Sequence, residues 1–192
     1  MCMRQSFYIE VDKADLKYVM KKLQNADKNA PRVIRNAINR TATQAMKMIR
    51  QGRSQGYTIA AGRFNSQVKK YPATPGRLEA TIKSSGRTHT LKNFKTSAPK
   101  SGGKADITKS GLKKLKGSRG GAAFIPSAGK AAGLMVQRRG KDRFPLKVFS
   151  ANSTPKMVEQ IYKGERGGQG DMEGKVRERL HEEIEKEIAK LI

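Results

Sequence analysis

The residue types that most often carry chemistry are few in this 192-residue chain and are poorly spaced for it. A single cysteine, Cys2, and two histidines, His89 and His181, provide too few partners for a zinc site or for a paired nucleophile and base. His89 lies in a threonine-rich segment and His181 in a strongly charged one, so solvated histidines are expected at both positions. We therefore expect no metal ion at these residues.

Short motifs for nucleotide or acyl-transfer chemistry are also incomplete. Gly129 and Lys130 are followed by Ala131, so the hydroxyl that a phosphate-binding loop offers to magnesium is missing. Ser-x-x-Lys spacings such as Ser127 to Lys130 are expected by chance in a lysine-rich chain. The acidic residues of the middle segment are isolated singletons, which excludes paired-carboxylate chemistry there. The sequence predicts neither an enzyme nor a bound cofactor.

Lysine and arginine are the abundant functional groups, and their placement is uneven. The chain holds 41 of them against 16 acidic residues, a formal charge of +25. Residues 28–158 carry 29 of the basic side chains but only three acidic ones, Glu79, Asp106 and Asp142. This density suits either the phosphate backbone of DNA or an acidic neighbouring protein, and the sequence leaves both open. No zinc-finger spacing or ribonucleoprotein-type aromatic strand is present, so any DNA contact would be with the backbone only.

A helix over about residues 31–51 places part of this charge on one face. At about 100° per residue, Ile34, Ile38, Ala45 and Ile49 share an apolar sector, and Gly52 and Gly56 are expected to break the helix. The opposite side collects the basic residues that we take as contacts for DNA or an acidic partner: Arg32, Arg35, Arg40, Lys47 and Arg50.

The middle of the chain has strand and turn signals. Residues 78–83 and 105–108 are short strand candidates, and 134–137 with 146–149 predict a hairpin. The segment 97–119, rich in Ser, Gly and Lys, reads equally as ordered or as a solvated basic loop. The hairpin loop supplies a second set of candidate contacts for DNA or an acidic partner: Arg138, Arg139, Lys141 and Arg143.

The two ends of the chain are nearly neutral and more regular. Residues 7–11 alternate as a half-buried strand does, and Asp12 with Asp15 then opens a helix to about Gln24. Residues 171–192 form an amphipathic helix. The apolar side chains of this helix line up in one stripe, which needs a partner surface in the same chain or in a neighbouring subunit. We assign these residues to such packing: Leu180, Ile184 and Ile188.

These elements predict one α+β domain over residues 1–192. It has an N-terminal strand and two helices over 1–56, a small central antiparallel sheet with long basic loops over 57–150, and a C-terminal helical part over 151–192, with a flexible joint near 164–174. No apolar run approaches the length of a membrane span and no secretory signal is apparent, so no membrane partner is expected.

Several stretches, in order and spacing, form a recognisable pattern. They are 37–42 (AINRTA), 57–62 (YTIAAG), 73–82 (ATPGRLEATI), 123–126 (AFIP), 136–146 (VQRRGKDRFPL) and 153–157 (STPKM). Together they resemble the minor tail protein Z family of long-tailed bacteriophages, also described as tail-completion proteins. The resemblance spans about residues 30–160 and reappears in the terminal helix, whereas the strand at 7–11 is not part of that pattern.

The resemblance implies a non-enzymatic virion component that acts late in tail assembly, at the head-proximal end of the tail, where head and tail join. It implies a homo-oligomeric ring, with a hexamer favoured, around the channel through which the genome passes. The neighbours would be neck, tail-terminator and tail-tube proteins, and the chain would be found in the virion and, during assembly, in the host cytoplasm. The alternative is a free, sequence-independent DNA- or RNA-binding protein, which charge alone favours.

Overall fold

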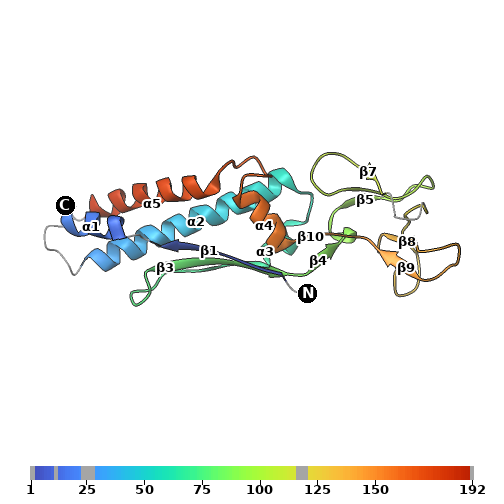
Figure 1. The fold of residues 1–192 in the computed structure, drawn as a ribbon, viewed down its shortest axis with the longest axis horizontal. Coiled ribbons are helices and arrows are strands. Elements are labelled where there is room, and N and C mark those ends of the chain that lie inside the picture. The colour runs from blue at the N-terminus through green and yellow to red at the C-terminus, as the bar shows by residue number, and fades with distance from the viewer. Residues whose placement is uncertain (1–2, 11–12, 23–28, 116–120, 191–192) are drawn as a thin grey trace.

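A 27-residue helix, α2 (Ala30–Gly56), runs along the middle of the molecule (Figure 1). The structure is a computed structural model that describes residues 3–10, 13–22, 29–115 and 121–190. The terminal helix α5 (Met172–Ile188) lies along one side of α2, and a sheet that includes β1 (Met3–Glu10) lies along the other. Helix α2 is thus the middle layer of a body made of two long helices and a sheet.

The other elements are shorter. The remaining helices are α1 (Lys13–Lys22), α3 (Ala61–Asn65), α4 (Thr154–Tyr162) and the single 3-10 turn η1 (Leu91–Asn93). The remaining strands are β2 (Val68–Tyr71), β3 (Glu79–Gly86), β4 (Thr88–Thr90), β5 (Lys95–Ser97), β6 (Lys104–Asp106), β7 (Lys113–Lys114), β8 (Val136–Arg138), β9 (Leu146–Val148) and β10 (Ser150–Ser153). Helices combined with small antiparallel sheets confirm the predicted α+β class.

The opening strand is an integral part of the body sheet. It pairs antiparallel with β3 along its whole length, from Met3 opposite Gly86 to Glu10 opposite Glu79, and β2 pairs with the other edge of β3. The predicted strands at 7–11 and 78–83 are therefore partners. The predicted inward side chains of the opening strand, and the helix-opening Asp12, lie outside the residues or side chains that the structure describes.

Helix α2 continues past the point where glycine was expected to end it. The apolar sector of Ile34, Ile38, Ala45 and Ile49 is buried as predicted. Gly52, however, lies inside the helix. A side chain is not tolerated there, because a Cβ would clash with Ile161 Cγ2 of α4. The prediction of a break was wrong, since this glycine serves the close approach of α4 rather than a turn.

The segment between α4 and α5 packs tightly on the end of α2. Gly167 is buried at a positive φ of 85°, and its backbone nitrogen would be 2.9 Å from a Cβ placed on Gly56. Gln169 donates through Nε2 to Gln55 Oε1 at 2.9 Å and is itself buried. The segment expected as a flexible joint is therefore a packed turn, which fixes where α5 begins.

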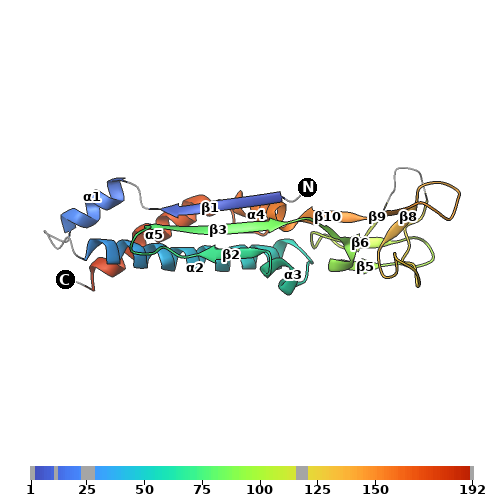
Figure 2. The ribbon, with the colours of Figure 1, turned by 90° about the horizontal axis from the view of Figure 1, so that it is seen from below.

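The described residues of 91–149, which are 91–115 and 121–149, form a β-rich extension at one end of the molecule, which we call the distal lobe (Figures 1 and 2). It contains the β5–β6–β7 sheet and the β8–β9 hairpin, which confirms the hairpin predicted from 134–137 and 146–149. The segment 97–119, as far as it is described, is folded, because β6 and β7 lie within it. Leu91, Phe94 and Met135 connect the lobe to the same buried core that fills the body.

Candidate anion-binding surface

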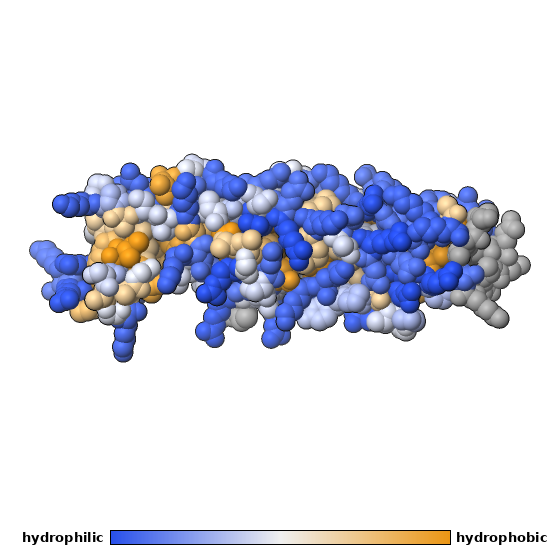
Figure 3. Space-filling view, turned by 180° about the vertical axis from the view of Figure 1, so that it is seen from behind, coloured by the Kyte–Doolittle hydropathy of each residue, from blue (hydrophilic) through white to orange (hydrophobic). Residues whose placement is uncertain are grey.

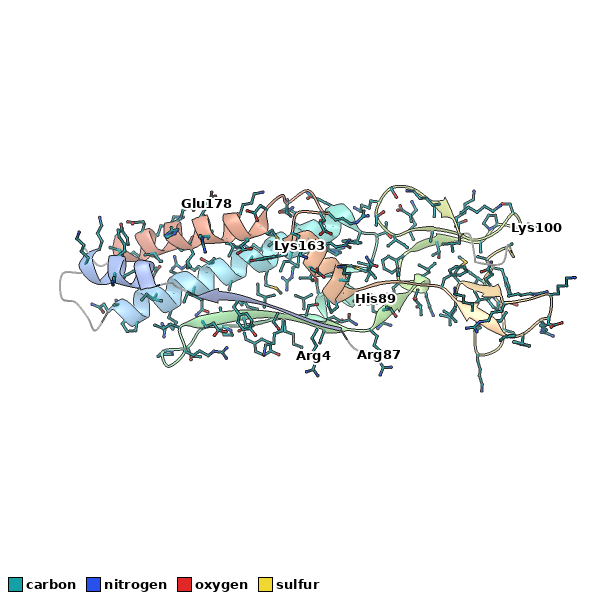
Figure 4. The ribbon with its side chains drawn as sticks, in the orientation of Figure 1. Arg4, Arg87, His89, Lys100, Lys163 and Glu178 are labelled. Atoms are coloured by element: carbon teal, nitrogen blue, oxygen red, sulfur yellow. The ribbon has the colours of Figure 1, made fainter. Side chains whose placement is uncertain are left out.

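The distal lobe is joined to the body through β4, which pairs antiparallel with β10. His89 of β4 is 5% exposed. Its Nε2 lies 2.8 Å from Thr154 Oγ1 at the start of α4, and its Nδ1 lies 3.4 Å from Asn93 Nδ2. Figure 4 places this residue at the junction of lobe and body. The expectation of a solvated histidine was wrong here, because strands about 60 residues apart in the sequence close over the ring.

The environment of His89 favours its neutral form. Burial lowers the pKa of the imidazole below its usual value, and the positive charge of Arg63 lowers it further. When Nε2 carries the proton it donates to Thr154 Oγ1, and Nδ1 accepts from Asn93. Both ring nitrogens thus serve the structure of the junction. His181, in contrast, is exposed on α5, as predicted.

The surface of the distal lobe is strongly cationic. In the sequence, residues 91–149 hold 15 lysines and arginines against two acidic residues, Asp106 and Asp142. Asp106 is only 7% exposed, which leaves Asp142 as the exposed carboxylate in the described part of the lobe. In Figure 4, Lys100 projects from the outer end. The exposed cations described in the lobe are Lys92, Lys95, Lys100, Lys109, Lys113, Lys114, Lys130, Arg138, Arg139, Lys141, Arg143 and Lys147.

Several cations of the body form ion pairs within the chain, whereas the described cations of the lobe generally do not. Arg139 aside, no lysine or arginine in the described part of the lobe forms an ion pair. In the body, Glu159 accepts from Lys163 at 2.8 Å and from Lys156 at 3.1 Å, and these hydrogen bonds lower its pKa. The lobe therefore presents a dense positive field to whatever lies beside it.

The four predicted cations of the hairpin are all in this surface. Arg138, Arg139, Lys141 and Arg143 are exposed at the end of β8 and in the loop that leads to β9. The guanidinium of Arg138 stacks over the ring of Phe124 at 5.9 Å, and that of Arg143 lies 5.8 Å from the Phe144 ring. Stacking orients a guanidinium while leaving its N–H groups able to donate to an anion.

The predicted basic residues of α2 lie elsewhere, on the body. Arg32, Lys47 and Arg50 are exposed, and Arg35 is half-buried. The guanidinium of Arg40 lies 3.0 Å from Glu187 and 3.6 Å from Glu183, two buried carboxylates of α5. Arg40 thus has a role in joining α2 to α5 inside this chain.

The Arg40 contact stabilises an ionised carboxylate in a buried position. Burial alone would raise the pKa of Glu187, but hydrogen bonds from Lys190 and Asn36, together with the charge of Arg40, outweigh it. The net result is a lowered pKa. Removing one partner of such a group leaves a buried charge uncompensated, which is costly.

The structure does not bring the two predicted basic sets into one site. The α2 residues follow a helix whose first turn lies at the end of the body away from the lobe, whereas the hairpin residues lie at the opposite end of the molecule (Figure 1). The hairpin set belongs with the lobe lysines, which our candidate residues omitted. The high lysine content of residues 92–114 was the signal that pointed to them.

The apolar stripe of the terminal helix finds its partner within the chain. Leu180, Ile184 and Ile188 are between 1% and 5% exposed, and α5 packs along α2. Asp171 caps the helix by accepting from the backbone N–H groups of Glu173 and Gly174. The stripe assigned to core or subunit packing is therefore part of the core, and only the charged outer face, where Glu178 points away in Figure 4, is exposed.

No constellation for metal or membrane chemistry occurs among the described residues. They contain no group of three or more histidine, cysteine or acidic side chains that could hold a metal ion. None of the described helices is both long and apolar enough to cross a membrane. Lys130, which follows Gly129, is exposed in a turn.

Comparison with known families identifies the family of this α+β chain. A family model described as "Prophage minor tail protein Z (GPZ)" matches residues 15–192, which places the chain among the structural proteins of phage tails. The chain belongs to the minor tail protein Z family. The match leaves out the whole of the opening strand β1, which the sequence pattern had also left outside the resemblance. Neither a curated protein nor a solved structure matches the chain significantly.

Proposed function

We propose that this tail protein acts as a tail-completion component at the head-proximal end of the tail, in tail assembly and head–tail joining. Several copies, with six favoured, would form a ring around the channel for the genome. In this arrangement the distal lobe contacts either the phosphate backbone of DNA or the acidic surface of a neighbouring neck, tail-terminator or tail-tube protein. The chain would be made in the host cytoplasm and carried in the virion.

One observation carries the proposal: the exposed cations of the lobe far outnumber its carboxylates. The 15 basic residues of segment 91–149 face two aspartates, one of which is buried. Subunits with this field would repel one another unless an anionic surface lay between or beside them. An elongated subunit with a strongly cationic lobe at one end is suited to a ring in which the lobes meet such a surface.

The test is a deletion of the gene, followed by electron microscopy of the particles produced. The proposal expects filled heads and uncompleted tails that remain separate, with infectivity restored when the protein is supplied from a plasmid. Infectious joined particles without the protein would overturn it. Native mass spectrometry of the isolated neck would give the number of copies directly, and a monomer there would overturn the ring.

The second candidate, a free nucleic-acid-binding protein, is favoured by the total charge of +25. It predicts that the purified monomer binds duplexes of unrelated sequence with equal affinity. The logarithm of its affinity would fall with the logarithm of salt concentration, by about 0.9 per phosphate neutralised. Tight duplex binding together with normal virions after gene deletion would favour this candidate over the tail-completion role.

A further inference from the structure

The distal lobe contains a pocket that phosphate contacts alone do not require. It has a volume of about 610 Å³ and lies between the β8–β9 hairpin and the segment that precedes it. Its apolar lining includes Phe124, Leu134, Phe144, Leu146 and Val148. In Figure 3, apolar surface gathers at the lobe end of the molecule among projecting hydrophilic side chains.

The pocket leaves large apolar side chains exposed. Phe144 is 65% exposed and Val148 is 40% exposed, and both line the pocket. The adjacent Ile125 is 39% exposed. Single exposed apolar residues are common, but three together beside a pocket indicate a surface that is covered when the protein is in its assembly. The pocket has room for an apolar side chain of a partner.

Cations stand at the same pocket. Lys130, Arg138 and Arg143 are among its lining residues and form no ion pair within the described chain. The two guanidiniums are stacked on Phe124 and Phe144, and so are positioned beside the apolar surface. A ligand for this site must therefore supply an apolar group and negative charge within a short distance of each other.

Duplex DNA offers phosphates but no projecting apolar group that could enter a pocket, because its thymine methyls lie within the major groove. We propose that the pocket binds an acidic peptide segment of a neighbouring virion protein, in which an apolar or aromatic side chain is flanked by Asp or Glu. The apolar side chain enters the pocket, and the carboxylates accept hydrogen bonds from Lys130, Arg138 and Arg143.

This inference deepens the proposed function, because it rests on that proposal for the place of the partner in the virion. The binding chemistry itself is measured on the purified full-length chain without virions. Failure of peptide binding beside a head–tail joining defect in the deletion would reject the pocket and leave the proposed function standing. Peptide binding by the purified chain, together with normal virions after deletion of the gene, would support the pocket and reject the proposed function.

The probe is a fluorescein-labelled peptide of about twelve residues, with one Phe between two pairs of Glu, followed by fluorescence anisotropy. The matched probe carries Ser in place of Phe. Phe144→Ala and the double variant Arg138→Gln, Arg143→Gln should each weaken binding of the Phe peptide by about tenfold or more. The Ser peptide should bind about tenfold more weakly than the Phe peptide to the unmodified chain.

The matched protein control is Lys95→Gln with Lys113→Gln, which removes the same charge from exposed positions on the β5–β6–β7 sheet of the lobe. It should change binding by less than about twofold. Phe144→Leu, which retains an apolar side chain, should preserve binding. Circular dichroism of Phe144→Ala checks that this variant is folded, as expected for a side chain that is 65% exposed. Equal affinity for the Phe and Ser peptides would overturn the proposal, as would an equal loss in the control.

A duplex of about 20 base pairs serves as the competing ligand. The proposal expects duplex binding, where it occurs, to be insensitive to Phe144→Ala. If the Phe144→Ala variant lost duplex binding as well as peptide binding, the pocket would be a nucleic-acid site and the peptide assignment would be overturned.

Discussion

At the scale of single residues, His89 shows how a polar side chain is used to hold the lobe on the body. Its ring is enclosed by β4, the turn at Asn93 and the start of α4, with Phe94 edge-on at 6.3 Å between ring centroids. Sequence reasoning placed it in a solvated loop, because Thr88 and Thr90 on either side gave no sign of a buried face. Its burial comes from strand β10, which lies far away in the sequence.

This burial predicts a pH dependence of stability. The pKa of His89 is lowered in the folded protein, so below about pH 6.5 the unfolded chain binds a proton that the folded chain does not. The contribution of the neutral His89 to the free energy of unfolding should therefore be fully present well above about pH 6.5. It should be lost progressively as the pH falls below that value. Urea unfolding at a series of pH values measures this.

The variant His89→Asn tests the assignment, because an amide that does not titrate should reduce the fall in stability between about pH 7 and 5. It should also lower stability at neutral pH, since it cannot reproduce both contacts of the ring. A profile unchanged by His89→Asn would mean that another group titrates.

At the scale of elements, sequence periodicity located most helices and strands, and its errors have a common physical cause. The apolar sector of α2 and the stripe of α5 follow from local spacing, so both could be predicted. The end of α2 could not be predicted, because the reason for a glycine at position 52 is its close approach to Ile161, more than 100 residues later in the sequence. Helix α4 was missed although Ser153 is its N-cap and Pro155 lies in its first turn, which together form a recognisable start signal.

The contact between α2 and α4 gives a prediction for Gly52→Ala. A Cβ at this position would lie 2.4 Å from Ile161 Cγ2 and 3.3 Å from Gln169 Cγ, both in buried residues. Overpacking of this kind costs about 1–3 kcal/mol, which exceeds the gain of about 1 kcal/mol from replacing glycine within a helix. The free energy of unfolding should fall, as measured by urea denaturation.

Gly62→Ala is the matched control for Gly52→Ala. Gly62 lies within helix α3, and a Cβ there would meet nothing within 4 Å. The helical preference for alanine should therefore act alone and leave the protein as stable as the wild type or more stable by up to about 1 kcal/mol. If Gly52→Ala behaved like Gly62→Ala, the close packing of α4 on α2 would be incorrect.

The packing of α5 gives a second prediction at this scale. Leu180→Asp with Ile184→Asp places two carboxylates in the interface with α2, where the side chains are 5% and 1% exposed. The loss of apolar burial and the desolvation of charge should cost several kcal/mol and unfold the isolated chain. Circular dichroism of the purified protein reads this out without any assembly.

The control for this double variant is Arg177→Asp with His181→Asp, which has the same spacing on the exposed face of α5. It should leave the chain folded. A folded Leu180→Asp, Ile184→Asp protein that fails only in tail assembly would instead mean that the stripe contacts a neighbouring subunit.

At the scale of the whole molecule, the division of charge between body and lobe was only partly visible in the sequence. Counting basic residues located the excess in the middle of the chain, but that segment includes both α2 and the lobe. The fold separates them, because α2 is built into the body and Arg40 is engaged by α5, whereas the lobe cations project at one end. The pocket beside Phe144 depends on the hairpin and the preceding segment together, so no local pattern indicated it.

The exposed cations of the lobe can be removed without changing the contacts that hold the body together. Replacing Lys95, Lys100 and Lys113 with Gln removes three exposed lobe cations that form no ion pair in the described chain. Stability should stay within about 0.5 kcal/mol of the wild type, because no buried contact is lost. If the lobe meets an anionic surface, infectivity in a complementation assay should fall by about tenfold or more.

A matched variant removes three exposed lysines from the body: Lys17, Lys21 and Lys69. The two triple variants have the same net charge, so they differ only in where the charge is removed. Normal infectivity with the body variant and reduced infectivity with the lobe variant would establish the lobe as the contact surface. Equal losses would show that total charge governs assembly, and the lobe would then have no special part in it.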